Sequence, residues 1–300
     1  MRRVEAGTRT EIISGRYGDL NSNTPKRGGL RNLEIRVECC EVMNKILTTV
    51  KKYQFMFEEL VKRDFKQKYK RSVLGMAWSV LSPLLTLFVM NIIFSNFFSK
   101  DIAHYTTYLF TGTIVLSYYK ESTKNGMQSL MSNAKIFTKI NVPKYLFLLS
   151  KNVSALVNFG LTLLVYFAFC IFDGITFRPM MVLLVFPILC LLIMDIGIGA
   201  ILSALFVFFR DIQYLYEVFL TLITYMSAVF YSVDKLPQHL QTALYLNPVY
   251  VYIKYMRLIV IDGIIPSLAY HGLCVFYAAF YLSLGMLIYK KCNHSFLYYL

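Results

Sequence analysis

Long hydrophobic stretches without charge alternate along this chain with short segments that carry most of the charged residues. A helix of roughly 20 apolar residues is long enough to cross the hydrocarbon core of a membrane. Only two of the long stretches contain an acidic residue, which is Asp195 in one and Glu217 in the other. The pattern predicts an all-α integral membrane protein whose six transmembrane helices lie within residues 72–99, 102–119, 152–172, 179–209, 212–233 and 263–289.

The segment before the first of these stretches has an amphipathic pattern. Within residues 46–71, apolar residues recur at helical spacing, at Ile46, Val50, Tyr53, Phe57, Leu60 and Val61. The other side of this helix carries Lys52, Lys62, Arg63, Lys66 and Lys70. Residues 43–71 are therefore predicted to be a cytoplasmic amphipathic helix lying in the membrane interface, ahead of a six-span domain at 72–291 and a cytoplasmic tail at 292–300. A solvated basic face that packs on protein is the alternative.

Residues 236–261 are apolar but fit neither a loop nor a simple span. They contain Pro237, the pair Asn247–Pro248, and two cations, Lys254 and Arg257. Proline ends a helix at the residue before it. The segment is predicted to be a re-entrant hairpin of two short helices between spans five and six, and two further half-spans are the alternative.

The first 42 residues are polar, with eight Lys and Arg, six acidic residues and no apolar stretch. This composition is typical of disorder. No hydrophobic region follows Arg2 and Arg3, so a cleavable leader is not expected. We expect Met43 to be the native start, with residues 1–42 as an extension upstream of it.

Composition supports the membrane assignment. A soluble domain usually carries about 25% charged residues, whereas this chain has 16%, together with 57% apolar residues and a mean hydropathy of +0.52. The net charge of +14 would suit nucleic acid, but the basic residues flank the hydrophobic stretches, where they set topology and attract anionic lipid. The segments predicted to be cytoplasmic hold 26 of the 31 Lys and Arg residues, so both termini are expected in the cytoplasm and no nucleic-acid partner is expected.

The sequence lacks the common motifs of enzymes and nucleotide-binding proteins. It has no GxxxxGK[ST] phosphate loop, no HExxH and no GxSxG, and its six cysteines do not have the spacing of metal ligands. We therefore expect no catalytic residue, cofactor or metal on this chain. Asp195, a carboxylate in the middle of a predicted span, is a candidate functional residue. A structural hydrogen bond and a role in transport both remain open for it.

The stretch from Arg63 to Leu85 resembles the motif that opens the membrane domain of bacterial type-2 ABC exporter permeases, the subunits that export O-antigen, capsular polysaccharide and teichoic acid. The matching positions are Arg63, Asp64, Tyr69, Ser72, Leu74, Gly75, Trp78, Pro83, Leu84 and Leu85. Three later places agree in order, namely the cytoplasmic coupling segment at Asn133–Ser150, the charged pair Arg210–Asp211, and the external hairpin with Leu246, Asn247, Pro248 and Arg257.

The resemblance covers residues 45–290, with three departures. Val142 stands where the family usually has an aromatic residue, Lys144 where arginine is commoner, and Ala228 where proline often occurs. These departures leave the family resemblance intact and weaken any inference about which glycan is carried.

The resemblance implies that two copies of this chain pair with two ABC ATPase subunits, which bind the ATP. Contact with the ATPase would fall on Asn133, Lys135, Lys139, Pro143 and Lys144. The cytoplasmic gate and its interface would include Arg63, Asp64, Tyr69, Arg71, Gly75, Trp78, Pro83, Arg210 and Asp211, and the external hairpin would use Asn247, Pro248 and Arg257.

The implied function is that of a permease that moves a lipid-linked polysaccharide or polyol-phosphate polymer outward across the bacterial cytoplasmic membrane. A type-2 ABC permease for a drug or a small lipid is one alternative. A membrane-embedded glycosyltransferase acting on lipid-linked sugars is another, and a scaffold without transport activity is a third.

Overall fold

The computed structural model describes residues 52–68, 74–75, 77–98, 104–137, 139, 142–233, 236–292 and 296. All regular elements in these ranges are helices, as the all-α prediction requires. Residues 52–68 form the first helix. After it come α2 (Ala77–Phe98), α3 (Tyr105–Phe137), α4 (Tyr145–Phe172), the 3-10 helix η1 (Pro179–Leu184), α5 (Val185–Phe208), α6 (Ile212–Met226), α7 (Gln238–Leu244), α8 (Pro248–Val260) and α9 (Leu268–Cys292).

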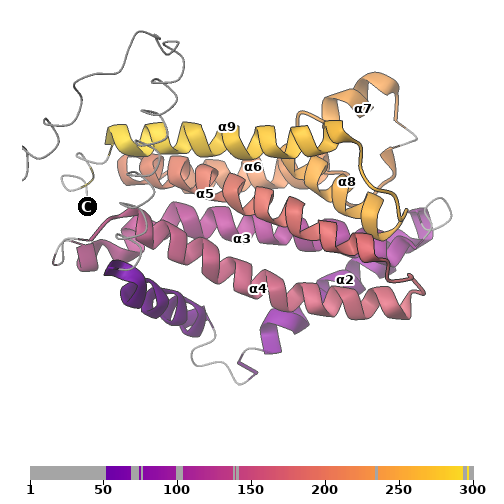
Figure 1. Cartoon of the computed structure of the whole chain (residues 1–300), viewed down its shortest axis with the longest axis horizontal. Coiled ribbons are helices and arrows are strands. Elements are labelled where there is room, and N and C mark those ends of the chain that lie inside the picture. The colour runs from indigo at the N-terminus through magenta and orange to yellow at the C-terminus, as the bar shows by residue number, and fades with distance from the viewer. Residues whose placement is uncertain are drawn as a thin grey trace, which may run out of the picture. The chain divides into compact units, whose positions relative to one another are not determined.

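The chain divides into two compact units, Met1–Phe55 and Met56–Leu300, and the contacts described below belong to the second. Within it the long helices run side by side (Figure 1). The helices α7 and α8 lie at one end of this bundle, and the end of α3 and the beginning of α4 lie at the other (Figure 1). The predicted extension at 1–42, together with Tyr69, Arg71 and residues 297–300, lies outside the described residues.

The helix α5 packs on both α3 and α9, and glycine makes this close packing possible. A Cβ atom at Gly197 would collide with the backbone of Tyr281 in α9, and one at Gly285 would collide with the backbone of Gly197. On the opposite side, a Cβ at Gly126 of α3 would lie 2.9 Å from the Cα of Gly199. Small residues let helices approach closely inside a membrane, where lipid is as apolar as the side chains.

Four of the described helices are long and apolar enough to cross a membrane, and they comprise Ala77–Ser95, Tyr145–Phe172, Pro179–Phe208 and Leu268–Cys292. The two other predicted spans, 102–119 and 212–233, are not among these four helices. From Tyr105 onward the first of them lies in α3, which continues to Phe137 and includes the charged residues Lys120, Glu121 and Lys124.

The predicted span at 212–233 is not a single helix, because α6 ends at Met226. The chain then turns through Ala228, whose φ of 47° lies in the left-handed region that non-glycine residues seldom adopt. This turn leaves carbonyl groups without helical hydrogen-bond partners, and the guanidinium of Arg257 in α8 donates hydrogen bonds to them. It donates to the carbonyl oxygens of Ala228 at 2.9 Å and Val229 at 3.1 Å. A buried cation thus stabilises the turn that follows α6 by bonding its free carbonyl groups.

Candidate functional site

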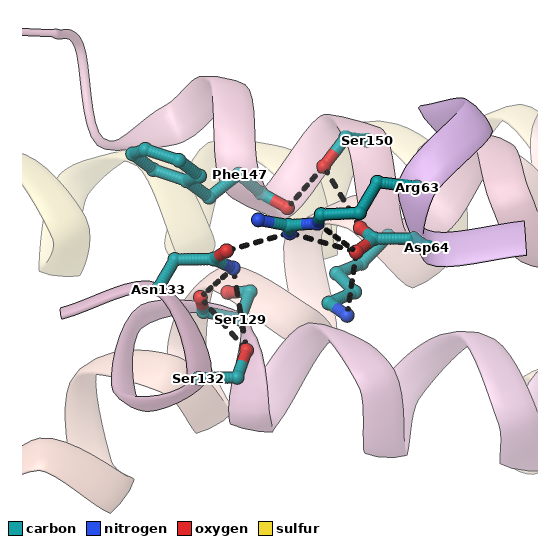
Figure 2. A network of polar contacts seen from close by, with 8 residues as sticks. Arg63, Asp64, Ser129, Ser132, Asn133, Phe147 and Ser150 are labelled. Carbon is teal, nitrogen blue, oxygen red and sulfur yellow. Dashed lines mark hydrogen bonds and ion pairs between the residues drawn. The ribbon is translucent and has the colours of Figure 1, made fainter. Parts of the chain in front are cut away.

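A polar junction joins the first helix to the end of α3 and the beginning of α4 (Figure 2). Arg63 donates from Nη2 to Oδ1 of Asn133 at 2.7 Å, and from the same nitrogen to Oδ1 of Asp64 at 2.7 Å. We call the set Arg63, Asp64, Asn133, Ser150 and Lys151 the junction network.

Asp64 is the centre of the junction network. Its side chain is only 3% exposed, and its carboxylate forms ion pairs with two cations. Arg63 lies 2.7 Å away, and Nζ of Lys151 lies 3.2 Å from Oδ1. Ser150 donates to the second carboxylate oxygen at 3.4 Å. A buried carboxylate is stable only when it is paired and hydrogen-bonded, and both conditions hold here.

The partners on α3 and α4 are themselves held in place. Asn133 is buried, and its amide donates to the carbonyl oxygen of Ser129 at 2.8 Å, one helical turn earlier. Ser150 is also buried, and its hydroxyl lies 3.0 Å from the carbonyl oxygen of Phe147. The network therefore connects three separate segments through side chains with fixed positions, and movement of one segment changes the contacts of the others (Figure 2).

The remaining residues predicted to contact an ATPase lie beyond this junction. Lys135 near the end of α3 and Lys139 after it are exposed. Lys144, at the start of α4, places its ammonium 5.3 Å from the ring centroid of Phe296. Burial lowers the pKa of the Lys144 ammonium. Pro143 is half-buried beside it. These residues offer basic charge next to the junction network.

The other residues predicted for the gate are distributed along the chain. Gly75 has φ of 51° in the turn before α2, a conformation that suits glycine. Trp78 lies in the first turn of α2 and is 41% exposed, and Pro83 lies inside that helix. Arg210 and Asp211 form the exposed turn between α5 and α6. Neither side chain of this pair makes an ion pair with the residues that the structure describes.

The predicted hairpin residues lie on two short helices, α7 and α8. Asn247 caps α8 by accepting a hydrogen bond from the backbone of Val249, and its amide donates to the hydroxyl of Ser227 at 2.9 Å. Pro248 occupies the first position of α8, where its missing N–H costs nothing. Arg257 is buried and also stacks on the ring of Tyr108, 3.4 Å from its centroid.

Asp195 is fully buried in α5. Neither of its carboxylate oxygens has a hydrogen-bond partner in the part of the chain that the structure describes. Within the same residues, no group of three or more His, Cys, Asp or Glu side chains is arranged to hold a metal ion.

Two members of the junction network were not predicted individually. Ser150 is the last residue of the segment assigned to coupling, and Lys151 follows it. The signal available in the sequence was the single cation Lys151 at the edge of an otherwise uncharged stretch, but its pairing with Asp64, 87 positions earlier, needed the fold.

Comparison with known proteins identifies the family. The profile of the "ABC-2 type transporter" family matches residues 56–261. Two O-antigen export system permease proteins RfbA of Klebsiella pneumoniae are 29% and 27% identical to this chain, and each match covers 81% of this chain and 95% of the relative. The protein of the same name from Myxococcus xanthus is 26% identical over 64% of this chain and 74% of its own length. The family match extends over most of the chain and includes the junction network, and the protein belongs to the ABC-2 type transporter family.

Proposed function

We propose that this chain is the permease subunit of an ABC exporter that moves a lipid-linked polysaccharide outward across the bacterial cytoplasmic membrane. The observation that carries the proposal is the extent of the similarity to O-antigen export permeases, which covers 95% of two relatives and 81% of this chain. A match of this extent includes the membrane helices and the cytoplasmic segments together, so it supports the transport role of the whole subunit.

A separate ATPase subunit would hydrolyse the ATP. Binding of ATP to that subunit can drive this chain only by favouring one of its conformations over another. The junction network supports such coupling, because Asn133 and Ser150 connect the end of α3 and the start of α4 to the helix that carries Arg63. We infer that the ATPase contacts the exposed basic residues Lys135 and Lys139 and moves the junction network with them.

We further propose a six-span topology with both termini in the cytoplasm. The helices α2, α4, η1 with α5, and α9 would provide four spans. The uncharged first half of α3 would provide another, with its charged second half extending into the cytoplasm. The helix α6 has 15 residues, or about 22 Å at 1.5 Å per residue, and would cross only part of the hydrocarbon core.

The hairpin of α7 and α8 would lie in the part of the membrane that α6 does not cross. Non-helical backbone is tolerated at membrane depth only where protein or water covers it. Arg257 donates to three carbonyl oxygens, two of which belong to the turn after α6. This arrangement supports a re-entrant hairpin that returns without crossing. The complex would contain two copies of this chain and two ATPase subunits.

The test is a deletion strain complemented with this chain, examined for surface polysaccharide with a glycan-specific antibody. We expect surface polysaccharide to be lost in the deletion strain, to accumulate inside the cell, and to return on complementation. A partner ATPase without its phosphate-loop lysine should leave the chain in the membrane and still abolish export. An unchanged surface glycan together with broad drug sensitivity would instead favour a drug or small-lipid permease.

A co-purification in mild detergent tests the composition of the complex. We expect an ATPase subunit with a phosphate loop to be recovered in about equal amount. Turnover of lipid-linked sugars by the isolated chain, with no ATPase recovered, would support the glycosyltransferase alternative.

A further inference from the structure

A cavity of about 400 Å³ lies between α2, α3 and α4. Ligand pockets in proteins usually have volumes of roughly 300–1,000 Å³, so it is large enough for a small ligand. We call it the three-helix cavity. It is lined by Lys68, Trp78, Ser79, Ser82, Pro83, Thr86, Thr113, Ile114, Ser117, Tyr118, Glu121, Ala155, Asn158, Phe159 and Thr162.

The lining is unusually rich in hydroxyl groups for helices with this apolar content. Seven of the lining residues are Ser, Thr or Tyr. Several threonine hydroxyls donate to carbonyl oxygens of their own helix, as Thr86 does to Ser82 and Thr113 does to Phe110. A hydroxyl that donates in this way keeps its oxygen lone pairs as acceptors. The cavity wall therefore offers hydrogen-bond acceptors to a ligand that carries donors.

Tyr118 contributes its ring, and not its hydroxyl, to the cavity wall. The residue is 3% exposed, and its phenolic oxygen is buried out of reach of a ligand. Its ring packs against that of Phe159 with 4.7 Å between centroids. The two rings therefore form an apolar part of the wall beside the serine and threonine hydroxyls.

An ion pair between Lys68 and Glu121 lies at one side of the cavity. Nζ of Lys68 lies 2.6 Å from Oε1 of Glu121, and the amide of Asn158 donates to Oε2 of Glu121 at 3.0 Å. Each carboxylate oxygen retains accepting capacity after these bonds. Trp78 adds an indole, which is 41% exposed and combines an aromatic face with one N–H donor.

From this combination we propose that the three-helix cavity binds a sugar ring. Sugar hydroxyls both donate and accept, so they match a wall of hydroxyl oxygens, a carboxylate and an amide, while the C–H face of a sugar ring packs on an aromatic side chain. A phosphate fits less well, because Lys68 is already paired with Glu121 and the carboxylate repels a second anion. A lipid tail would leave the polar wall without partners.

This inference rests on the proposed function and deepens it, because it places recognition of the exported sugar inside one subunit. The ring could belong to the headgroup of a lipid-linked sugar or to the glycan chain itself. Both sources present the same hydroxyl chemistry to the cavity.

The experiment uses the intact exporter, permease with ATPase, in lipid nanodiscs. An alkyl maltoside with a photoreactive diazirine at the start of its alkyl chain serves as the probe, and an alkyl phosphocholine with the same chain serves as the matched control. After irradiation, digestion and mass spectrometry locate the labelled peptides. We expect the maltoside to label peptides that line the three-helix cavity at least fivefold more than the phosphocholine does.

Competition with free maltose then shows whether the bound sugar ring belongs to a glycan chain or to a glycolipid headgroup. Competition by millimolar maltose would indicate that the sugar alone is recognised, as in a glycan chain. Competition by unlabelled alkyl maltoside and not by maltose would indicate a glycolipid headgroup. Equal labelling of the cavity by maltoside and phosphocholine would overturn the proposal.

Two variants separate ligand binding from folding. Trp78→Leu removes the aromatic face and the N–H donor from the cavity wall, so the unfolding temperature should change little while maltoside labelling falls at least threefold. Thr221→Val on α6 removes an exposed threonine hydroxyl outside the cavity and should leave labelling unchanged. Equal labelling in wild type and Trp78→Leu would overturn the assignment of a sugar site to this cavity. The proposed function would still stand if surface polysaccharide depended on the chain.

Discussion

Arg63 and Asn133 are 70 positions apart in the sequence, and the guanidinium of the first lies 2.7 Å from the amide oxygen of the second. Arg63 also pairs with Asp64, which in turn is bonded to two residues at the start of α4. One arginine therefore connects the helix before the membrane domain to the cytoplasmic side proposed for the bundle. Under the proposed coupling, a residue at this position would influence transport without touching either ATP or cargo.

The first prediction concerns Asp64. The substitution Asp64→Asn removes the charge that Arg63 and Lys151 share, and each cation then loses a charge-assisted hydrogen bond worth about 1.5–3 kcal/mol. We expect membrane insertion to persist, with a lower unfolding temperature and at least tenfold less polysaccharide on the surface. Differential scanning fluorimetry in nanodiscs and an immunoblot for surface glycan measure the two effects.

Glu59 provides the control for Asp64. It pairs with Lys62 on the same helix at 3.1 Å, but both side chains are more than half exposed. Exposed pairs contribute about 0–1 kcal/mol. Glu59→Gln should therefore leave both the unfolding temperature and the surface glycan close to wild type. Equal effects of the two substitutions would show that the charge of the helix matters and that the junction network does not.

The second prediction concerns the basic residues proposed to contact the ATPase. Replacement of Lys135, Lys139 and Lys144 with Glu should reduce recovery of the ATPase in co-purification while the permease remains in the membrane. Because Lys144 also contacts Phe296, the double variant Lys135→Glu with Lys139→Glu isolates the exposed pair.

The exposed residues Lys290 and Lys291 at the end of α9 supply a matched charge reversal. Their double replacement with Glu should change ATPase recovery less than the Lys135 and Lys139 pair does. Undiminished ATPase recovery with all three coupling lysines replaced would exclude this segment as the contact surface.

The positions of the uncharged helices were predictable because the apolar stretches are long. The bounds of α3 were not, because Glu121 and Lys124 remain helical beyond the predicted span. Each pairs with a residue on another element, Lys68 at 2.6 Å and Glu217 at 2.9 Å. The charges marked this segment as cytoplasmic but did not show that the helix continues through it, since the sequence does not show which distant residue pairs with each charge.

The site was predictable in part for a similar reason. Arg63, Asp64 and Asn133 were identified through family resemblance, but they were assigned to two separate roles, and the structure places them in one network. The three-helix cavity was not predicted at all. Its serine and threonine residues are spread over three helices, and on any one helix they resemble ordinary small residues at a packing surface.

The third prediction concerns the close contact of α5 and α9. Gly197→Ala places a Cβ atom against the backbone of Tyr281, and overpacking of this kind costs about 1–3 kcal/mol. We expect a lower unfolding temperature and reduced yield of folded permease in nanodiscs. The controls are Gly160→Ala and Gly272→Ala, since a Cβ at either position meets nothing within 4 Å. A wild-type unfolding temperature for Gly197→Ala would contradict the contact.

The fourth prediction concerns Arg257. The substitution Arg257→Met keeps an extended apolar side chain but removes the donors to the carbonyl oxygens of Tyr108, Ala228 and Val229. Each buried carbonyl left without a partner costs about 1–3 kcal/mol. We expect a lower unfolding temperature and faster proteolysis between α6 and α7. Arg178→Met removes an exposed guanidinium that also donates to a carbonyl oxygen, and it should have a much smaller effect.

The backbone contact between Gly197 and Gly285 also restricts the kind of motion that this subunit can perform. A shear of α9 along α5 would bring larger side chains into a space that holds no Cβ atom, so these two helices must move as one rigid body. Helix 52–68 is instead connected to α3 and α4 through side-chain hydrogen bonds and ion pairs at Arg63 and Asp64, and long polar side chains can change partners. If the proposed ATPase moves this subunit, the displacement should therefore occur between helix 52–68 and the pair α5 and α9, and not between α5 and α9.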